Sequence, residues 1–550
     1  MNTPEPSDDA ASHCVGVTGG EVVVASLRAH GVDVVFGIPG THNLSIFDAL
    51  RRYHVRVVAT THEQGAGYAA DGYARTSRRP GVAVVTGGPA VYNAATALAQ
   101  AYSDSSPVLM VSPAMPRHLA ANAAGSGYLH EAKDQGGAMA LIVDRSLRPT
   151  THQQIADAVA EAFTVMTHGR PRPVHIEIPL DLLEECGDAS LTLAPAPSVQ
   201  GIDATNVELA AHLLADAERV LIIAGGGAVG ATDSLRKIAE LLAAPVATTI
   251  NGTGVLSGDH RLSLGSRLGT RAVVNALEAA DVLLIVGSEL GQSDLYLGAL
   301  SPTGSVIRID IDERMATVNV NSDLFIAGDS AHALRDLHDA LVPLVTDDRS
   351  GTPQWVDDLL TQVRVETQRT GAIWLPWVEA LAGALDSDAI LATDNAMCVY
   401  YGVIPQLVVR HPASLHFPTG FGTLGFTVPV AIGSALAAPD RQVVGISGDG
   451  GLLFTVTEIA TAAAERLPIA FIVFDNSGYG EIRNEMLDRG EQPVAVAAPP
   501  RDLVRLAESL GAYAVRISTP EQLPPELTAA RTRSGPTVVV VLEPPREEKQ

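Results

Sequence analysis

The chain has 550 residues, of which 46% are hydrophobic and 18% charged, and its formal net charge is −25. This length exceeds what one hydrophobic core supports, so we expect about three domains. The negative charge argues against a nucleic-acid partner, because such binding depends on cationic side chains that neutralise phosphates. The sequence contains no apolar run of the roughly 20 residues that a membrane-spanning helix needs.

The N-terminal residues and the cysteines narrow the class of protein further. Residues 1–12 are polar and acidic, unlike a secretory signal. The three cysteines are widely spaced, which indicates neither a disulfide framework nor a metal-ligand cluster. We therefore expect a cytoplasmic globular protein that has no membrane partner.

Short apolar runs alternate with alanine- and leucine-rich segments along the whole chain. Runs such as 108–111, 220–223 and 282–286 are typical of strands buried on both faces of a parallel sheet. The pattern predicts an α/β protein of three consecutive doubly wound parallel-sheet domains. A Pro/Ala-rich segment at 193–201 and a polar segment at 347–353 have the composition of linkers. The predicted parts are a disordered tail at 1–14 and domains at 15–190, 200–345 and 355–545.

In the first domain, Glu63 opens a predicted helix directly after a predicted strand. The segment reads Thr-His-Glu-Gln-Gly-Ala-Gly from residue 61. Strand ends of this kind are where α/β proteins present catalytic groups. The alternative is an ordinary first-turn glutamate that the helix dipole stabilises.

In the central domain, Gly225, Gly227 and Gly230 form a G-x-G-x-x-G pattern after a predicted strand. By itself this pattern is a weak signal for dinucleotide binding. An acidic residue should end a second strand about 20 residues later, but the sequence there continues with Asn251 and Gly252. We therefore expect this domain to be mainly structural.

In the third domain, two oxygen-bearing side chains follow two predicted strands. Asp449 follows the run 442–447, Asn476 follows 469–474, and the helix-compatible stretch 452–466 lies between them. Neighbouring parallel strands would bring both side chains to one sheet edge. Mg²⁺ prefers such oxygen ligands together with phosphate oxygens, and adjacent glycines let the backbone approach a diphosphate. The alternative is two turns, which Asp, Asn and Gly commonly form.

Together these segments resemble the motifs of thiamine diphosphate-dependent enzymes of the acetolactate synthase and 2-oxo acid decarboxylase type. The resemblance extends over roughly residues 15–545 and is most specific around His-Glu-Gln-Gly-Ala-Gly at 62–67 and Gly-Asp-Gly at 448–450. It implies that the first domain binds the pyrimidine ring and that the central domain has a nucleotide-binding type of fold. The third domain would then bind thiamine diphosphate and Mg²⁺.

The resemblance implies catalytic roles for four residues of the first domain. Glu63 would hydrogen-bond the aminopyrimidine ring, and Thr41 and His42 would face the reacting centre. His130 would relay a proton, since histidine changes charge near neutral pH; capping a turn is its alternative role. In this family the glutamate and the metal site belong to different subunits, which implies an obligate homodimer and further assembly into a homotetramer.

The resemblance also implies a set of cofactor contacts. The glycine-rich loop that begins at Thr419 would place Leu424 beneath the cofactor and bring its two rings together, whereas core packing is the alternative role of Leu424. The implied metal ligands are Asp449, Asn476 and the carbonyl oxygen of Gly478. The predicted cofactor-binding residues are Glu63, Pro89, Asn93, Asn395, Gly422, Leu424, Gly448, Asp449, Gly450, Gly451, Asn476, Gly478 and Tyr479. Relatives of the acetolactate synthase type bind FAD through a segment that differs here, at 287–294, so FAD is not expected.

Within this superfamily the chain most resembles the 5-guanidino-2-oxopentanoate (2-ketoarginine) decarboxylases, on the segments 37–42, 129–135 and 479–485. The resemblance implies non-oxidative decarboxylation of a 2-oxo acid to an aldehyde and CO₂. An acetolactate synthase-like carboligase that joins two 2-oxo acids is the alternative. A catalytically silent protein is disfavoured by the presence of Glu63, and an NAD-dependent dehydrogenase would rest on the central glycine pattern alone.

A guanidinium-bearing substrate requires a carboxylate that can accept its planar set of donors. Glu481 follows the predicted metal loop closely enough to face the pocket, Glu485 lies one helical turn farther on, and Gln135 is a further candidate for substrate contact. Glu289 and Asp294 are a second acidic possibility. The alternative is that these carboxylates are solvated surface charges.

Overall fold

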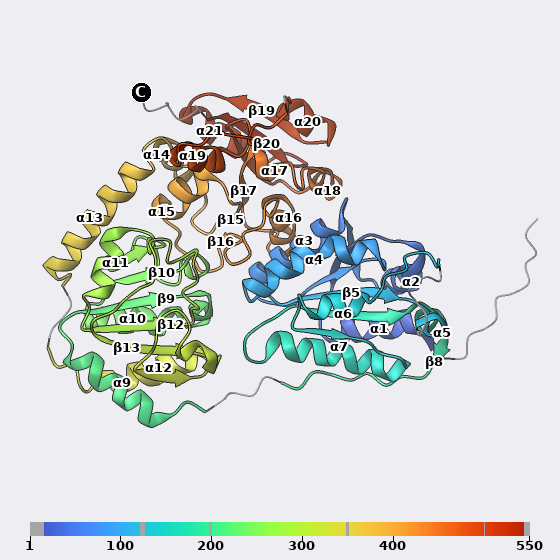
Figure 1. Cartoon of the computed structure of the whole chain (residues 1–550), viewed down its shortest axis with the longest axis horizontal. Helices are drawn as coiled ribbons and strands as arrows, with labels where there is room; N and C mark the ends of the chain where they lie inside the picture. Colours follow the sequence, from blue (N-terminus) through green and yellow to red (C-terminus); the bar gives the residue numbers. More distant parts are fainter. Residues whose placement is uncertain (1–15, 121–126, 197–200, 348–350, 500, 544–550) are drawn as a thin grey trace, which may run out of the picture.

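The computed structural model describes residues 16–120, 127–196, 201–347, 351–499 and 501–543. The predicted tail at 1–14 and parts of both predicted linkers lie outside these ranges. Three six-stranded sheets follow one another along the chain, and all their strand pairs are parallel. This confirms the predicted α/β class. Figure 1 shows the three domains around a common centre, with the N-terminal domain in blue and cyan, the central domain in green and the C-terminal domain in orange and red.

The N-terminal sheet has the strand order β3-β2-β4-β5-β7-β6. Its central strands are Val-rich and buried on both faces, as the continuous apolar runs predicted. The strands are β2 (Val34–Gly37), β3 (Arg56–Ala59), β4 (Gly81–Val84), β5 (Val108–Ala114), β6 (Arg145–Leu147) and β7 (Val174–Pro179). The main helices are α1 (Gly19–Ala29), α2 (Leu44–Arg52), α3 (Glu63–Ser77), α4 (Pro89–Ser103), α6 (Gln135–Ala140) and α7 (His152–Thr167). Five shorter elements are η1 (Thr41–Asn43), α5 (Arg117–Ala120), α8 (Leu180–Glu184) and the antiparallel strands β1 (Val17–Thr18) and β8 (Cys186–Gly187).

The central sheet has the order β11-β10-β9-β12-β13-β14, so the direction of winding changes between β9 and β12. The strands are β9 (Val220–Ala224), β10 (Val246–Thr248), β11 (Ser263–Gly265), β12 (Val282–Val286), β13 (Ser305–Asp310) and β14 (Leu324–Ala327). The helices are α9 (Ala204–Asp216), α10 (Thr232–Leu242), α11 (Arg271–Glu278) and α12 (Ser330–Leu341), with short helices η2 (Gly226–Ala231), η3 (Ile250–Gly252) and η4 (Glu313–Ala316). Helix α13 (Gln354–Thr370) buries Val356, Leu359 and Val363 in the hydrophobic clusters of this domain.

The C-terminal sheet has the order β16-β15-β17-β18-β20-β19, and β17 pairs with β18 as the predicted metal site requires. The predicted helical stretch 452–466 is instead two short helices, because the chain turns between residues 453 and 457. The strands are β15 (Ile390–Thr393), β16 (Leu415–His416), β17 (Val443–Gly448), β18 (Ala470–Asp475), β19 (Tyr513–Ile517) and β20 (Thr537–Leu542). The helices are α14 (Leu375–Ala382), η5 (Cys398–Val403), α15 (Ile404–Gln406), α16 (Thr427–Ala437), α17 (Asp449–Leu452), α18 (Glu458–Ala464), α19 (Gly480–Asp488), α20 (Leu503–Ser509), η6 (Pro520–Gln522) and α21 (Leu523–Ala530).

The N-terminal and C-terminal domains share one hydrophobic core, which is formed mainly where α3 crosses α16. The two helices touch through their backbones, since a Cβ at Gly433 would overlap the carbonyl of Ala69 and approach the amide nitrogen of Tyr73 to 2.7 Å. Beside this crossing, the rings of Tyr68 and Phe426 pack at a centroid distance of 5.5 Å. The close contact fixes how the two domains are oriented.

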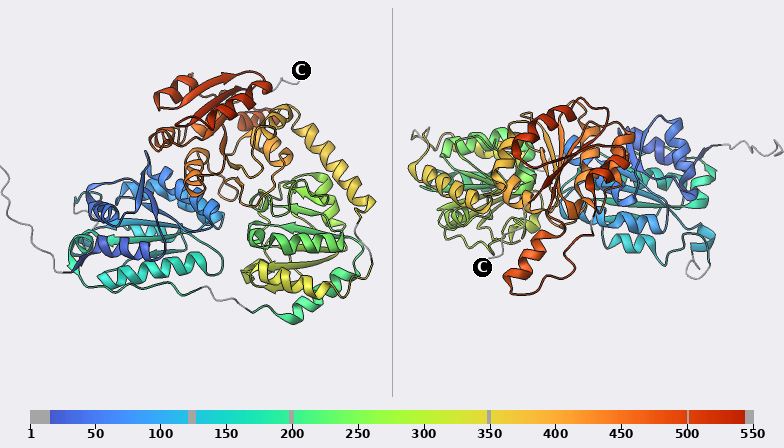
Figure 2. Two further views of the ribbon diagram at one scale, coloured as in Figure 1. Left: turned by 180° about the vertical axis from the view of Figure 1, so that it is seen from behind. Right: turned by 90° about the horizontal axis from the view of Figure 1, so that it is seen from above.

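All three domains meet at Thr419, in the loop between β16 and α16. From the central domain, Asn251 donates to Thr419 Oγ1 at 3.1 Å and Ser293 donates to the Thr419 carbonyl at 2.9 Å. From the N-terminal domain, Asp104 accepts hydrogen bonds from the backbone N–H and the hydroxyl of the same threonine. In the view from above, α19 and the loop that follows it stand out from the C-terminal domain (Figure 2).

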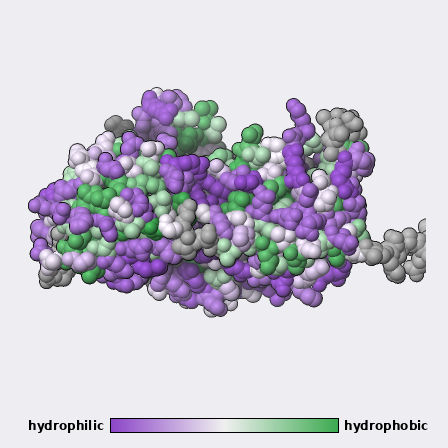
Figure 3. All heavy atoms as spheres, turned by 90° about the horizontal axis from the view of Figure 1, so that it is seen from below, coloured by the Kyte–Doolittle hydropathy of each residue, from purple (hydrophilic) through white to green (hydrophobic). Residues whose placement is uncertain are grey.

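The surface mixes polar and apolar residues. Seen from below, hydrophobic patches are interrupted by hydrophilic residues (Figure 3). Within the described ranges, no helix combines the length and the apolar character that crossing a membrane demands. Cys186 is disulfide-bonded, whereas Cys398 is a buried free thiol.

Candidate cofactor and substrate site

The two predicted metal ligands lie together at the carboxyl edge of the C-terminal sheet. Asp449 is fully buried at the start of α17, and its Oδ1 accepts a hydrogen bond from the backbone N–H of Asn476 at 3.3 Å. The carbonyl of Gly478 faces the same place, since a Cβ on Gly450 would come within 3.1 Å of its oxygen. Gly478 itself has φ of +143°, a conformation that favours glycine.

The side chain of Asn476 is oriented by a carboxylate that sequence reasoning missed. Its Nδ2 donates to Glu543 Oε2 at 3.0 Å, and Glu543 in turn accepts from Trp374 Nε1 at 2.6 Å. Asn476 Oδ1 is buried and, among the described residues, has no hydrogen-bond partner. Because a buried polar atom without a partner is costly, this oxygen marks a place for a ligand. Glu543 follows β20, so its position at a strand end was the available sequence signal.

A second missed residue, Arg501, supplies positive charge at this place. Its guanidinium forms an ion pair with the Asp449 carboxylate and lies 3.7 Å from Asp475 Oδ1. A buried carboxylate requires a compensating cation, and here an arginine provides it. Arg501 therefore occupies the position where a metal ion would meet Asp449.

The donor set at this edge fits Mg²⁺. A carboxylate, an amide oxygen and a backbone carbonyl are the hard oxygen ligands that this ion takes. In the part of the chain that the structure describes, no group of three or more His, Cys, Asp or Glu side chains could hold a metal. A metal here would therefore use the mixed set of Asp449, Asn476 and Gly478.

The glycine-rich loop presents the residues that were predicted to contact the cofactor. Gly422 is exposed with φ of +69°, and Leu424 is partly exposed rather than in the core. Asn395 Nδ2 donates to the Thr423 carbonyl at 2.8 Å, so this side chain supports the loop. Gly448 is half-buried, Gly450 and Gly451 are buried beside Asp449, and the Tyr479 ring would lie 3.0 Å from a Cβ on Gly450.

Asp394, which sequence reasoning also missed, lies under this loop. It is fully buried and accepts hydrogen bonds from the backbone N–H groups of Gly425 and Asn395, each at 2.8 Å. Burial raises its pKa to about 6 despite these bonds. It occurs directly after β15, in the same kind of position as Asp449.

In the N-terminal domain, Glu63 is the first residue of α3, as predicted, and its side chain is partly exposed. Its Oε2 accepts a hydrogen bond from Asn93 Nδ2 at 2.9 Å. Asn93 and Pro89 lie in the first turns of α4, so the predicted contact Asn93 is brought to Glu63.

The two predicted histidines are in contact. The His42 and His130 rings meet edge to face at 4.7 Å, and Tyr128 packs on His42. Burial, with a smaller effect of His130, lowers the pKa of His42. His130 has φ of +65°, and its Nδ1 is buried without a hydrogen-bond partner among the described residues. Thr41 begins the same short helix as His42 and is exposed.

Gln135 is placed differently from its predicted substrate role. The side chain is buried, its oxygen accepts from Gly88 N at 2.7 Å, and its nitrogen donates to Ser112, Pro113 and Glu177. Because the amide is fully used within the domain, the geometry favours support of the loop at Gly88 over direct contact with substrate.

Glu481 lies at the base of α19, beside a cluster of tyrosines. Tyr401 Oη donates to Glu481 Oε1 at 2.6 Å, and Tyr400 Oη donates to Asn395 Oδ1 at 2.9 Å. Both tyrosines belong to η5, a π-helical turn of a kind that is frequent at functional sites. Burial, with a smaller effect of Glu481, raises the pKa of Tyr296 in the central domain. Glu481 is thereby linked through two tyrosines to the loop that carries Leu424.

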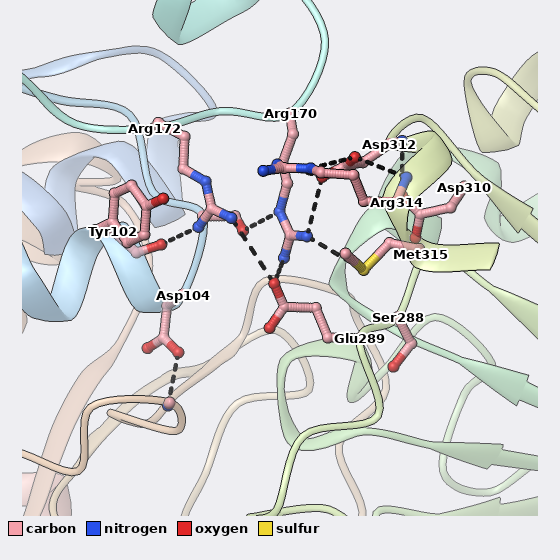
Figure 4. A network of polar contacts seen from close by, with 12 residues as sticks. Tyr102, Asp104, Arg170, Arg172, Ser288, Glu289, Asp310, Asp312, Arg314 and Met315 are labelled. Atoms are coloured by element: carbon pink, nitrogen blue, oxygen red, sulfur yellow. Dashed lines mark hydrogen bonds and ion pairs between the residues drawn. The ribbon is translucent and has the colours of Figure 1, made fainter. Parts of the chain in front are cut away.

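The other acidic candidates are less available. Glu485 forms a long ion pair with Arg489, at 3.8 Å. Glu289 forms an ion pair with Arg170, and its Oε1 lies 3.8 Å from Arg172 (Figure 4). Asp294 accepts a hydrogen bond from Ile250 N at 3.2 Å, and burial raises its pKa to about 7.

The central glycine pattern packs tightly against the end of β12. Gly227 N donates to the Gly287 carbonyl at 3.0 Å, and a Cβ on Gly225 would overlap the same carbonyl. Beyond it, a cavity of about 340 Å³ between the N-terminal and central domains is lined by arginines and carboxylates. Charges of this lining pair with one another, as Figure 4 shows for Asp312 with Arg170 and Arg314.

Comparison with known proteins gives three matching family models. They are described as the N-terminal TPP binding domain, the central domain and the C-terminal TPP binding domain of thiamine pyrophosphate enzymes, at residues 17–138, 207–337 and 400–541. The chain belongs to the thiamine pyrophosphate enzyme family. This confirms the family that the sequence motifs indicated.

Curated relatives of this thiamine pyrophosphate enzyme carry two kinds of name. A probable 2-ketoarginine decarboxylase, AruI, from Pseudomonas aeruginosa is 37% identical over 95% of the chain and 93% of its own length. A probable acetolactate synthase large subunit from Methanocaldococcus jannaschii is 32% identical over 96% of the chain and 92% of its own length. The acetolactate synthase large subunit of Parasynechococcus marenigrum is 31% identical, covering 96% and 87%.

For this thiamine pyrophosphate enzyme, the residues of the central domain do not fit a flavin. A dinucleotide would need free backbone N–H groups in the glycine loop and free cations for its phosphates. The Gly227 N–H is bonded to Gly287, and Arg170 and Arg172 already face Glu289. No step of the reaction is therefore assigned to FAD.

Proposed function

We propose that the protein catalyses the thiamine diphosphate- and Mg²⁺-dependent, non-oxidative decarboxylation of a 2-oxo acid with a cationic side chain. The first candidate substrate is 5-guanidino-2-oxopentanoate, which would give an aldehyde and CO₂. The observation that carries this proposal is Glu481, a carboxylate among tyrosines beside the cofactor loop. The name of the Pseudomonas aeruginosa relative supports the same substrate.

In this proposal the cofactor is held by residues from both terminal domains. Asp449, Asn476 and the Gly478 carbonyl would bind Mg²⁺, and Glu63 would hydrogen-bond the aminopyrimidine ring. The neighbouring contacts would come from Pro89, Asn93, Asn395, Gly422, Leu424, Gly448, Gly450, Gly451 and Tyr479. When bound, thiamine diphosphate supplies the electron sink that lets CO₂ leave a 2-oxo acid.

The histidine pair would handle protons in this reaction. His130 Nδ1 is buried and lacks a partner among the described residues, and His42 lies against the same ring. Burial lowers the pKa of His42, which favours its neutral form, the form that can accept a proton. Delivery of a proton by His130 would release an aldehyde, which favours decarboxylation over carboligation.

Glu481 would recognise the substrate cation. A guanidinium presents a planar fork of donors that a carboxylate accepts, and its face stacks on aromatic rings. Tyr401 donates to one oxygen of Glu481 and so fixes the orientation of this carboxylate.

The test is to incubate the protein with thiamine diphosphate, Mg²⁺ and a panel of 2-oxo acids. Carbon dioxide, aldehyde and acyloin should be measured together. We expect kcat/KM for 5-guanidino-2-oxopentanoate to exceed that for uncharged 2-oxo acids, with aldehyde as the product. Acyloin formation without aldehyde would support instead a carboligase, the class to which the acetolactate synthase relatives belong by name.

The substitution Glu481→Gln removes the charge and keeps the shape of the side chain. We expect kcat/KM for 5-guanidino-2-oxopentanoate to fall roughly 10- to 100-fold, the range for a hydrogen bond to a charged group, and kcat/KM for an uncharged 2-oxo acid to change little. Glu485→Gln, one turn along the same helix, is the matched control and should have a small effect. Equal losses on both substrates would remove the recognition role of Glu481.

A further inference from the structure

The loop at 419–425 has no regular secondary structure, yet an acidic residue of another domain holds its start. Asp104 Oδ1 accepts from Gly420 N at 3.0 Å and also pairs with the Thr419 hydroxyl, and its Oδ2 accepts from Thr419 N at 3.3 Å. Asp104 lies directly after α4 and points toward this loop of the C-terminal domain (Figure 4). One side chain of the N-terminal domain therefore fixes the first two residues of the loop.

Asp104 is itself held in place by partners in the N-terminal domain. Its side chain is 1% exposed and forms a 2.8 Å ion pair with Arg75, a residue of α3. Gln100 Nε2 donates to the same carboxylate at 2.7 Å. A buried carboxylate with this many charge-assisted hydrogen bonds has one well-defined position.

Gln100 holds the other end of the loop. Its Oε1 accepts from Thr423 N at 3.3 Å and from the Thr423 hydroxyl at 3.1 Å, and the glutamine is fully buried. Thr423 directly precedes Leu424, the residue proposed to lie beneath the cofactor. Between the two held ends, Phe421 and Gly422 are exposed.

We infer that Asp104 and Gln100 are positioning residues of the N-terminal domain, which set the loop at 419–425 and thereby the place of Leu424. The inference rests on the proposed role of Leu424 in shaping the bound cofactor. It assigns a second task to α4, whose first turns carry Asn93, the partner of Glu63.

The first readout is hydrogen–deuterium exchange of the peptide containing residues 419–425, measured by mass spectrometry without cofactor. In Gln100→Ala and Asp104→Asn we expect the amides of this peptide to exchange at least about tenfold faster. Each substitution removes or weakens a side-chain acceptor of the loop N–H groups, so the loop opens to solvent more often. Asp71→Asn is the matched control, since Asp71 is buried and pairs with the same Arg75 but the hydrogen bonds of its side chain in the described structure go to Arg75. Unchanged exchange in both variants, or an equal increase in Asp71→Asn, would overturn the inference.

The second readout is the exchange rate of the C2 proton of bound thiamine diphosphate, followed by NMR after acid quench. Gln100→Ala should slow this exchange about tenfold, whereas the affinity for Mg²⁺ should stay within about twofold, since Asp449, Asn476 and Gly478 lie outside this loop. If the loop amides exchange faster but the C2 exchange rate is unchanged, the loop does not act on the cofactor through Leu424. If the wild-type protein decarboxylated no 2-oxo acid, the proposed function would be wrong. Hydrogen–deuterium exchange of residues 419–425 would still decide whether Asp104 and Gln100 hold the loop.

Discussion

At the scale of single residues, the site is organised around buried charges that need partners. Asp449 was predictable from its Gly-Asp-Gly context, because such a carboxylate follows a strand at the sheet edge. Its partner Arg501 was not, since it comes 52 residues later and reaches Asp449 only through the fold. Asn476 shows the same division, because its ligand role was predicted but the Glu543 that orients it was not.

The pairing of Arg501 with Asp449 leads to a prediction about metal affinity. For Mg²⁺ to reach Asp449, this guanidinium must leave, so the arginine competes with the metal. We expect Arg501→Gln to tighten Mg²⁺ binding about tenfold in the presence of thiamine diphosphate, equivalent to about 1.4 kcal/mol. Isothermal titration calorimetry would measure it.

Arg505→Gln is the control for this experiment, because Arg505 is 83% exposed on the neighbouring helix and pairs only loosely with Asp502. That variant should bind Mg²⁺ like the wild type. Weaker binding by Arg501→Gln would mean that the arginine helps to hold the cofactor instead of competing with its metal.

At the scale of elements, the strands were predictable and the broken helix was not. Continuous apolar runs such as 282–286 became buried strands with nearly the predicted bounds, because few other structures can hide so many β-branched residues. The stretch 452–466 has helical composition, but the chain turns after α17 and places Thr455 and Glu458 in contact with other segments. Such tertiary contacts cannot be predicted from the local residue pattern.

The crossing of α3 and α16 gives the prediction at this scale. Gly433→Ala would place a methyl group where it overlaps the backbone of α3 at Ala69 and Tyr73. We expect a loss of about 1–3 kcal/mol in the free energy of unfolding, as for other overpacked sites. Chemical denaturation would measure the loss.

Gly383→Ala is a suitable comparison, since a methyl group there would meet its nearest neighbour at an ordinary 3.6 Å. This variant should be as stable as the wild type. If Gly433→Ala were equally stable, the helices could move apart, and their contact would not fix the orientation of the domains.

At the scale of the whole molecule, the sequence indicated three domains and their order, but not how the domains meet. Periodicity reports which residues are buried, whereas it carries no information on partners in another domain. The contacts of Asp104 and Gln100 with the C-terminal loop are of this second kind. Periodicity likewise carries no information on contacts between subunits. We propose a homodimer that associates further into a homotetramer.

Mixed dimers would test whether Glu63 and the metal site of one active centre come from different subunits. Glu63→Gln and Asp449→Ala are each expected to be inactive, but a dimer with one chain of each kind would contain one complete site. Co-expression with two affinity tags would isolate this species. We expect about half of the wild-type decarboxylation rate per dimer, as two equivalent sites predict.

The control is each variant purified alone in the same way, which should show only background decarboxylation. An inactive mixed dimer would place both residues of a site in one chain.

The meeting of three domains at Thr419 has a consequence for protein engineering. A chimaera that took its central domain from a relative would exchange Asn251 and Ser293, which anchor this threonine. An exchange of the central domain should therefore keep Asn251 and Ser293 in the incoming domain. Without them, the hybrid enzyme will fold well and still work poorly.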